Sequence, residues 1–406
     1  MSKSKFSKRS ILITLLVALA LVLPVSMTAA QGPEYITYNS MHGDPLPRAF
    51  DEEIVGMWNE ANPLTPVEHS IIAHEDFKQA IRAYLTAEPA PDVLTWFAGE
   101  RARFFIDRGL IADISDVFAD YGFNEAYAPG FVALASVEGS QYFLPTSYYW
   151  WAVYYRPSIF EQAGITPITI GTRYPWTAAA WFDYLNMRLN GPEFHVDLML
   201  LKESYTDERV KNVFEYWQQL FDHNCFIADA AAYAWQEALT PMTDGDAAMY
   251  LMGQFILDSY PDEMEDDLDF FRFPIIDPEI PIGEDAPTDG YFIAAGARNL
   301  DGGKEFLAYI GSQEIQQKAF DEMGRLPTRT DVDVSGATPA TQKGIELIQT
   351  ADYVAQFYDR DTTAPMAEAG LDGFSRFWSD PSSIDQILED LEAERLRILE
   401  EEAAAQ

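Results

Sequence analysis

Residues 35–96 read YITYNSMHGDPLPRAFDEEIVGMWNEANPLTPVEHSIIAHEDFKQAIRAYLTAEPAPDVLTW, and this stretch decides the fold class. Three short runs within it, Tyr35–Tyr38, Val67–Ile72 and Val93–Trp96, are rich in β-branched and aromatic residues. Such side chains favour strands because they pack well on a pleated, half-buried surface. We therefore expect three strands in this stretch.

The segments between these runs have the spacing of helices. Apolar residues recur at helical intervals over 50–58 and again over 77–85. The first helix is expected to stop at Asn62-Pro63 and the second at Pro89 and Pro91, because proline interrupts a helix. This alternation of strand and helix predicts an α/β fold, in which helices cover the faces of a sheet.

The remainder of the chain is long enough for a second lobe. The sequence has 406 residues, of which 48% are hydrophobic, and this exceeds what one ordinary core holds. The further elements that we expect are a helix over 210–221, strand-like runs over 247–255 and 291–297, a loop-rich connection over 261–289, a helix from Phe306 and a closing helix from Ser383.

The first thirty residues have the pattern of a secretory signal peptide. Basic residues at positions 3, 5, 8 and 9 precede an apolar run over 11–25. The small residues Thr28-Ala29-Ala30 follow this run, and the expected cleavage point lies after Ala30. The apolar run is short for a membrane span, and an uncleaved anchor is the alternative. We therefore expect an exported protein, periplasmic or extracellular, free or tethered by an uncleaved signal.

The net charge limits the kinds of binding partner that we expect, and the cysteine content limits the covalent chemistry. The formal net charge is −38, and such a surface repels nucleic acid and anionic lipid headgroups. Cys225 is the only cysteine, so no intramolecular disulfide can form and a buried thiol is expected. There is also no cysteine near Ala30 to carry a lipid.

Several catalytic patterns are missing from the sequence. Gly302-Gly303-Lys304-Glu305 lacks the hydroxyl residue that a phosphate-binding loop needs, and there is no Gly-x-Ser-x-Gly elbow. His69 and His74 are five apart, a spacing that does not favour a zinc site. The 65 acidic residues form carboxylate pairs by chance, so no glycosidase pair stands out. We expect no cofactor, no metal and no enzymatic activity.

The densest feature is the run Pro145–Tyr155, in which six of eleven residues are Tyr or Trp. In a strand, alternate residues face opposite sides, so some of these rings belong to a core. Tyr and Trp also carry polar groups that need partners. A ring face with polar groups beside it suits the C–H face of a sugar, and Tyr149 and Trp150 are candidates for that role.

Other candidate ligand contacts lie near the ends of expected elements. In open α/β sheets a ligand binds beyond the carboxyl ends of the strands. The candidates are His42, Asp44, Trp96, Glu100, Arg101, Trp176, Trp235, Phe255, Asp289 and Tyr291.

Segments in a characteristic order give the chain a family resemblance. They are Trp58–Pro63, Ala90–Val93, Phe143–Pro145 leading to Tyr154-Tyr155, Ile159–Ile165, Gly245–Met249 and Gly324–Pro327. Together they resemble the family 1 extracellular solute-binding proteins, which are the sugar-binding components of ATP-driven importers and are related to maltose-binding protein. The resemblance covers nearly the whole chain after residue 30.

The resemblance implies a two-lobe periplasmic-binding-protein fold, type II-like, with a hinge, a cleft and several crossovers between the lobes. The crossovers are expected near 143–146, 287–291 and 324–335. The expected division is a signal over 1–30, an N-terminal lobe over 31–142 and 288–330, a C-terminal lobe over 143–287 and 331–400, and an acidic tail over 401–406.

The resemblance also assigns roles to single residues. Trp96 matches a sugar-stacking tryptophan of the first lobe, and Phe255 matches a stacking aromatic of the second. Asp44 lies at the polar ligand loop, and Tyr149 follows the first crossover. Arg325 and Arg101 are expected to donate hydrogen bonds to the ligand.

The sequence departs from the family pattern after Gly164-Ile165. Relatives usually have an additional helix there, whereas here Ile165-Thr166-Pro167-Ile168 joins directly, which predicts that a helix is missing. Many bacterial relatives also carry a lipoprotein cysteine, which this chain lacks.

The expected function is therefore capture of a mono- or oligosaccharide and its delivery to a membrane permease of an ABC importer, by a monomer. Three alternatives remain open at this point. The same cleft could bind a cation such as a polyamine, through ring faces and carboxylates. The protein could also be an exported glycosidase-type enzyme, or a surface adhesin or sensor that binds another protein.

Overall fold

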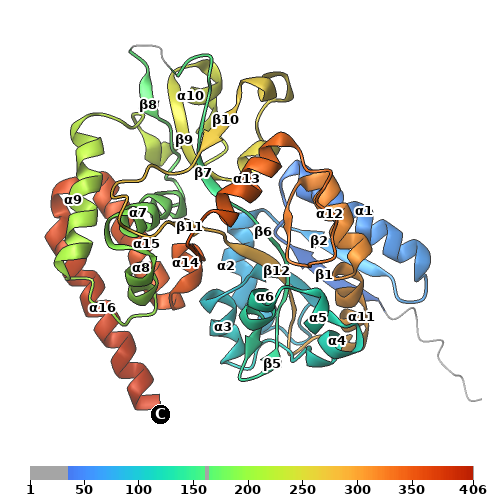
Figure 1. The fold of residues 1–406 in the computed structure, drawn as a ribbon. Helices are drawn as coiled ribbons and strands as arrows, with labels where there is room; N and C mark the ends of the chain where they lie inside the picture. The colour runs from blue at the N-terminus through green and yellow to red at the C-terminus, as the bar shows by residue number, and fades with distance from the viewer. Residues whose placement is uncertain (1–34, 161–163, 406) are drawn as a thin grey trace, which may run out of the picture.

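The computed structural model describes residues 35–160 and 164–405, and the signal-peptide prediction over 1–30 falls outside them. These residues form two lobes, each built around its own β-sheet and hydrophobic core (Figure 1). The chain passes between the two sheets after β6, before β12 and after β13.

The first lobe contains a six-stranded sheet in the order β13-β6-β12-β3-β1-β2. Strands β1, β2 and β3 are parallel, with β2 at the edge of the sheet, while β12 runs antiparallel to both β3 and β6. The strands are β1 (Ile36–Ser40), β2 (Val67–Ile71), β3 (Val93–Phe97), β6 (Leu144–Tyr148), β12 (Thr288–Ile293) and β13 (Leu326–Pro327). All five residues of β3 are buried because helices cover both of its faces.

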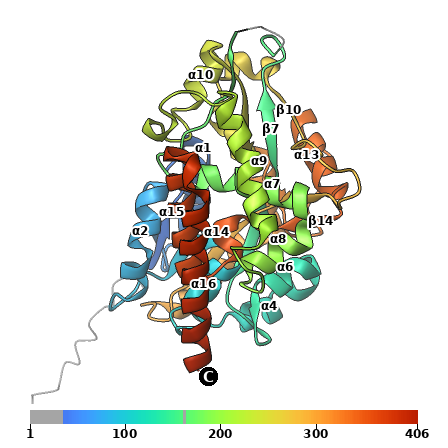
Figure 2. The same ribbon diagram turned by 90° about the vertical axis from the view of Figure 1, so that its left-hand side faces the viewer.

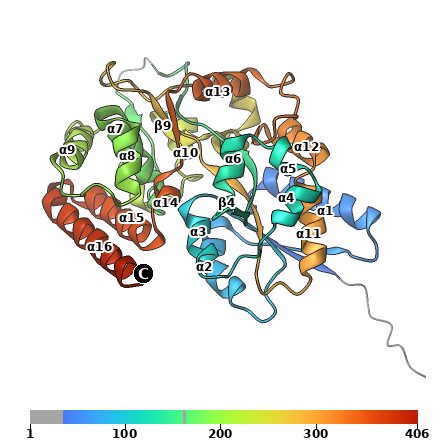
Figure 3. The ribbon, with the colours of Figure 1, turned by 60° about the horizontal axis from the view of Figure 1, so that its bottom comes forward.

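The helices of the first lobe surround this sheet, with α1 packed on β2 and α11 packed on β12 (Figure 3). They are α1 (Pro45–Ala61), α2 (His74–Leu85), α3 (Glu100–Ile106), α4 (Ser115–Asp120), α5 (Phe123–Ala126), α6 (Pro129–Leu134), α11 (Leu300–Ile310) and α12 (Gln313–Met323). A small hairpin, β4 (Ser136–Val137) and β5 (Ser140–Gln141), precedes β6.

The second lobe contains a four-stranded sheet in the order β10-β7-β9-β8. Its strands are β7 (Trp151–Tyr155), β8 (Thr166–Ile168), β9 (Ala247–Gly253) and β10 (Asp269–Phe271). A separate parallel pair, β11 (Gly283–Asp285) and β14 (Tyr353–Ala355), lies beside it.

Helices make up most of the second lobe. They are α7 (Trp176–Asn190), α8 (Pro192–Met199), α9 (Glu208–Asp222), α10 (Leu239–Asp244), α13 (Pro339–Gln349), α14 (Tyr358–Asp361), α15 (Ala364–Ser379) and α16 (Ile384–Ala405). Four short 3-10 turns are η1 (Ala230–Ala232), η2 (Gln254–Asp258), η3 (Asp262–Asp267) and η4 (Pro381–Ser383). The long helix α16 lies against α15 and α9 (Figure 2).

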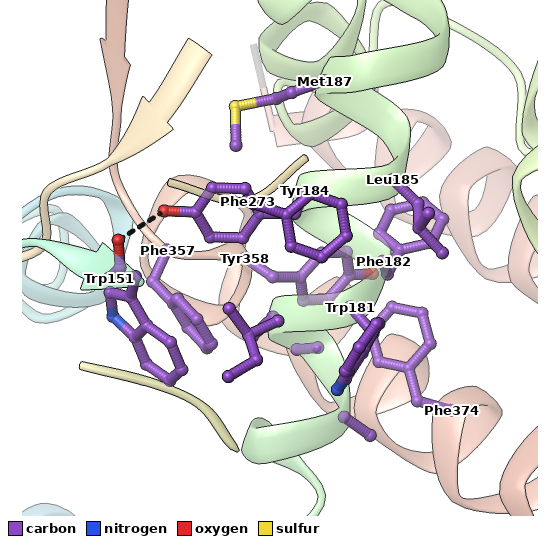
Figure 4. Packing of buried hydrophobic residues seen from close by; sticks show 14 of the residues in the cluster. Trp151, Trp181, Phe182, Tyr184, Leu185, Met187, Phe273, Phe357, Tyr358 and Phe374 are labelled. Atoms are coloured by element: carbon purple, nitrogen blue, oxygen red, sulfur yellow. Dashed lines mark hydrogen bonds between the residues drawn. The ribbon is translucent and has the colours of Figure 1, made fainter. Parts of the chain in front are cut away.

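Helix α7 forms the centre of the second lobe. Every residue from Thr177 to Arg188 is buried, since the helix packs against α8, α9, α15 and β9. A helix that is covered all round needs apolar residues on every side, which explains the sequence AAAWFDYLNM. Figure 4 shows Tyr184 of this helix between Phe273 and the strand β7, where its hydroxyl donates a 3.2 Å hydrogen bond to Trp151 O.

The structure confirms the predicted α/β class and most of the expected elements. The three strands predicted in 35–97 are β1, β2 and β3, and the predicted helices over 50–58, 77–85 and 210–221 lie in α1, α2 and α9. In the segment after Gly164-Ile165, β8 follows with no helix between them, and the next helix, α7, begins at Trp176. The loss of a helix relative to other members of the family stays a prediction. None of the helices in the described ranges is both long and apolar enough to cross a membrane.

Candidate ligand-binding site

A cavity of about 620 Å³ lies between the two lobes. The first lobe contributes the loop after β1, the start of α2, the end of β3 and strand β12. The second lobe contributes the start of β7, the start of α7 and the turn η2 after β9. The parallel strands β1 and β3 therefore direct their carboxyl ends into the cavity, as is general for α/β sheets.

Five aromatic side chains from the second lobe form one side of the cavity, which we call the aromatic wall: Tyr149, Trp151, Trp176, Trp235 and Phe255. Phe255 lies at its centre, in edge contact with the other four rings. The distances between the ring centroids are 5.5 Å to Tyr149, 6.0 Å to Trp151, 6.1 Å to Trp176 and 5.1 Å to Trp235. The steep angles between these rings, 62–87°, are a favourable arrangement for aromatic pairs.

Trp151 is held from behind by the core of its lobe. Its indole stacks on Phe357 at 4.8 Å and 19° (Figure 4), and its backbone carbonyl accepts the Tyr184 hydroxyl. Because these contacts fix the ring, the aromatic wall is a preformed surface and needs little ordering when a ligand binds.

Charged side chains that line the cavity are paired with one another. Arg360 donates to Asp289 Oδ1 at 2.7 Å and to the Tyr149 hydroxyl at 2.8 Å. Arg325 forms an ion pair with Asp258. Because these positive and negative side chains pair with one another, the lining of the cavity is polar but carries no large excess of one charge. The cavity therefore suits a ligand that forms hydrogen bonds better than one that is strongly charged.

A histidine in the loop after β1, His42, contacts a buried carboxylate of helix α1, Asp51. His42 Nδ1 lies 2.9 Å from Asp51 Oδ2 of α1, and Tyr38 donates its hydroxyl to the same oxygen at 2.9 Å. Burial would raise the pKa of Asp51, but the charges and hydrogen bonds of His42 and His69 hold that pKa well below its usual range. Asp51 is therefore ionised and orients the His42 ring.

Two further hydrogen bonds join the lobes across the cavity, in addition to the Arg360–Asp289 and Arg325–Asp258 ion pairs. Trp176 Nε1 of the second lobe donates to Glu75 Oε1 of the first at 3.0 Å, and Lys78 Nζ lies 2.9 Å from the other oxygen of Glu75. Gln236 Nε2 donates to Asp44 Oδ1 at 3.4 Å. Burial raises the pKa of Asp44. The structure therefore shows the two lobes in contact around the cavity.

The short helix α14 belongs to the second lobe and reaches the first. Its Asp359 forms an ion pair with Arg101 of α3, and the Arg360 guanidinium carbon lies 4.3 Å from the centroid of the Phe97 ring. This approach requires Gly99, because a Cβ there would lie 2.6 Å from Arg360 O and the φ of +75° disfavours other residues. Asp359 and Arg360 both line the cavity.

Comparison with known proteins identifies the family. Residues 42–317 match the family model described as bacterial extracellular solute-binding protein. The chain belongs to this family. Its two-lobe α/β fold is that of the periplasmic sugar-binding proteins.

Three relatives illustrate this extracellular solute-binding protein family. An uncharacterised ABC transporter extracellular-binding protein of Pyrococcus horikoshii is 21% identical over 335 residues, which cover 76% of this chain and 73% of the relative. The solute receptor AcbH, described by an exclusive preference for β-D-galactopyranose, is 27% identical with a TM-score of 0.84, over 90% of this chain and 100% of its own. A chitin oligosaccharide binding protein is 18% identical with a TM-score of 0.80, over 89% and 98%.

Nine of the residues predicted as ligand contacts line the cavity of this solute-binding protein. They are His42, Asp44, Tyr149, Trp176, Trp235, Phe255, Asp289, Tyr291 and Arg325. Their roles toward a ligand stay predictions, because the structure gives their positions and their contacts with one another.

Four other predicted residues lie outside the cavity wall. Trp96 is 2% exposed and packs among Phe77, Phe97 and Phe105 in the first core, while Phe97 lines the cavity in its place. Adjacent strand residues face opposite sides, so a stacking position shifted by one residue becomes a core position.

The same alternation applies to Trp150, which is fully buried against Phe270 at 5.7 Å, whereas its neighbours Tyr149 and Trp151 line the cavity. Glu100 and Arg101 begin helix α3, beyond the cavity wall. Arg101 instead joins α3 to α14 through Asp359, and burial raises the pKa of Glu100.

The sequence analysis missed several cavity residues of this solute-binding protein. Trp151 lies inside the aromatic run already noted, and strand alternation from Tyr149 would have selected it. From the sequence, we predict no strand that ends before Phe357, Asp359 and Arg360. No sequence signal therefore connects these residues with the cavity. Among the described residues, no group of His, Cys, Asp or Glu has an arrangement that could hold a metal ion.

Proposed function

We propose that this protein captures a carbohydrate between its two lobes, leaves it chemically unchanged, and delivers it to the permease of an ABC importer. The observation that carries the proposal is the cavity between the lobes, in which the aromatic wall of the second lobe lies beside ion-paired polar side chains that both lobes contribute. A pyranose has an apolar C–H face and a rim of hydroxyl groups, and this cavity offers complementary surfaces to both.

The ion-paired side chains supply both hydrogen-bond donors and hydrogen-bond acceptors for sugar hydroxyls. Asp289 and Asp258 accept hydrogen bonds, while Arg325 and Arg360 donate them, and each carboxylate is already fixed by its arginine. Fixed donors and acceptors select a ligand with matching hydroxyl geometry, because an unmatched buried polar group is costly.

The similar proteins support the choice of a sugar over other solutes. The solute receptor AcbH, at 27% identity, is described as preferring β-D-galactopyranose. By analogy we propose a sugar with one pyranose in contact with the aromatic wall. The extracellular-binding relative from Pyrococcus horikoshii supports a role with an ABC transporter.

Export fits this function. We propose that residues 1–30 direct the chain out of the cytoplasm and that it acts outside the inner membrane as a monomer. We also propose that the lobes divide the chain near residues 143, 288 and 331 and move about these connections, so that closure around a sugar presents both lobes to the permease.

Isothermal titration calorimetry with a panel of mono- and disaccharides tests this function. The proposal predicts saturable heat with one sugar per chain and recovery of unmodified sugar afterwards. The matched variant Trp176→Ala should weaken binding, whereas Trp378→Ala, a half-buried tryptophan of the same lobe outside the cavity, should not. No heat from any sugar, or release of hydrolysed product, would contradict the proposal.

A cationic solute such as a polyamine is the second candidate, because the aromatic wall and the carboxylate of Asp44 line the same cavity. Asp44 is hydrogen-bonded to Gln236 and forms no direct ion pair among the described residues, although His42 and Arg325 lie close enough to interact with its charge. Rings and a carboxylate together attract an ammonium group. Displacement of a bound sugar by spermidine, or heat from spermidine alone, would favour this candidate.

A further inference from the structure

One buried carboxylate oxygen of the first lobe is the meeting point of three side chains. Asp51 Oδ2 accepts hydrogen bonds of 2.9 Å from Tyr38 and His42, and His69 Nε2 lies 3.5 Å from it. The Asp51 side chain is 0% exposed. Of these four residues only His42 lines the cavity. The arrangement therefore links a buried anion to one cavity side chain.

These bonds determine which atom of His42 is available to a ligand. An ionised carboxylate only accepts hydrogen bonds, so Nδ1 of His42 carries the proton that it shares with Asp51. Nε2 has no hydrogen-bond partner within the described part of the chain, and the His42 side chain is 27% exposed. The Tyr291 ring meets the imidazole edge-on at 6.5 Å, which limits its rotation.

We propose that His42 is a direct contact for the sugar whose charge sets the binding affinity, and that Asp51 is the positioning residue that fixes its ring. This inference rests on the proposed function, because it names a role for two residues at the same site. With Nδ1 held by Asp51, neutral His42 offers a lone pair at Nε2 to a sugar hydroxyl, and protonated His42 offers an N–H.

The groups around His42 favour its charged form. Burial alone would lower the pKa of His42, but the charge and hydrogen bond of Asp51, together with Asp289 of β12, raise that pKa, while Arg325 before β13 opposes them. His69 and Tyr38 act on His42 through Asp51, and Asp44 lies two residues along the same loop. A charge-assisted hydrogen bond to a hydroxyl is about twice as strong as a neutral one.

Sugar affinity should therefore change with pH in one direction. Below the raised pKa of His42 the imidazolium donates to the sugar, and as the pH rises through that pKa the stronger bond is lost. We expect the Kd to increase about fivefold, the ratio that corresponds to about 1 kcal/mol. The change should lie above pH 6.5, the ordinary pKa of histidine.

Calorimetric titration of the sugar from pH 5.5 to pH 9 tests the inference in the full chain. Asp51→Asn keeps the shape of the side chain but removes its charge, so the transition should move to lower pH and the affinity at pH 7 should fall. His42→Gln should abolish the transition. Since Asp51 is buried, thermal unfolding must show that its variant folds, and the partly exposed His42 supplies the second test.

His74 provides the matched comparison because it is the other histidine that lines the cavity. Burial and the nearby cations Lys78, Arg360 and Arg101 hold the pKa of His74 well below its usual value, so it stays neutral over this range. His74→Gln should keep the transition. A pH-independent Kd in the wild type, or a transition that survives His42→Gln, would overturn the inference and leave the proposed function standing. If no sugar binds at any pH, both fail.

Discussion

At the scale of single residues, the position of Phe255 explains how the aromatic wall keeps its shape. Strand β9 ends at Gly253, and Gln254 then anchors the following turn through a 2.6 Å hydrogen bond from its side chain to Gly324 O. The ring of Phe255 is thereby held where the four other rings of the wall meet it. Because Phe255 contacts the other four rings, its removal should weaken the binding of any ligand that stacks on the aromatic wall, including a ligand that contacts only the neighbouring rings.

Phe255→Ala should weaken sugar binding by at least about tenfold, since a loss of about 1.4 kcal/mol follows from the removal of ring contacts. Phe271→Ala is the matched control, because Phe271 is also half-buried in the second lobe but contacts Tyr155 and Phe160 away from the cavity. Both variants should lose about 2 kcal/mol of stability in thermal unfolding. Equal affinities for the two variants would contradict this account of the wall.

A pair of buried aspartates in the second lobe gives a prediction about pH and stability. Both oxygens of Asp285 are buried without a hydrogen-bond partner in the described residues. Burial, followed by repulsion from Glu284, raises the pKa of Asp285 well above its usual value, and burial also raises the pKa of Asp183. Both groups are therefore protonated in the folded state at a pH where they ionise in the unfolded chain.

A raised carboxyl pKa contributes stability that is complete below the unfolded pKa of about 3.9 and is lost as the pH rises through the folded value. Asp285→Asn removes this dependence. In urea unfolding, the free energy of the wild type relative to the variant should fall by at least about 1 kcal/mol between pH 4 and pH 8. The exposed substitution Asp262→Asn should show no such change, and a flat difference for Asp285→Asn would argue against the buried acid.

At the scale of elements, periodicity located the strands and helices but could not set the direction of single side chains. Strand β3 was predicted over Val93–Trp96 and extends to Phe97, and it is Trp96 that packs in the core while Phe97 lines the cavity. A one-residue shift reverses every side chain of a strand, and both of these residues are equally apolar, so the pattern carries no information on the choice. Tyr149 and Trp150 present the same difficulty, because they lie between β6 and β7.

Helix α14 was beyond prediction for another reason. It has four residues, too few for a periodic signal, and its importance comes from contacts with segments more than 250 positions away, such as Arg101. Local sequence determines local structure, whereas the contact between α14 and α3 depends on how the two lobes meet. The cavity residues that were predicted, such as Asp289 and Trp176, lie at elements or aromatic residues visible in the sequence, whereas those of α14 have no such signal.

The contact between α14 and α3 can be measured by a double-mutant cycle. Arg101→Gln leaves Asp359, which is 6% exposed, without its partner and should cost about 2 kcal/mol, less than for a fully buried pair because Arg101 is 20% exposed. Asp359→Asn in the same chain should restore at least half of this loss in thermal unfolding. Additive losses in the double variant would show that the two side chains are not coupled.

At the scale of the whole molecule, ion pairs such as Arg101–Asp359 and weaker hydrogen bonds join the two lobes around the cavity. The bonds from Trp176 to Glu75 and from Gln236 to Asp44 are cross-lobe bonds between polar side chains, each worth about 1 kcal/mol. We propose that these two weaker bonds break and re-form as the lobes open and close around a ligand.

Removing both bonds with Trp176→Phe and Gln236→Ala should shift the protein without sugar toward a more open form. Small-angle X-ray scattering should then give a larger radius of gyration than for the wild type, and saturating sugar should abolish the difference. If the double variant and the wild type scatter identically without sugar, these two bonds do not control closure.

Native mass spectrometry of the purified protein with an equimolar mixture of sugars tests the central claim most directly. The account predicts a complex of one chain with one sugar of unchanged mass, which is lost in Phe255→Ala and retained in Phe271→Ala. A spectrum without any sugar complex, a complex with a polyamine in its place, or a sugar of altered mass would contradict it.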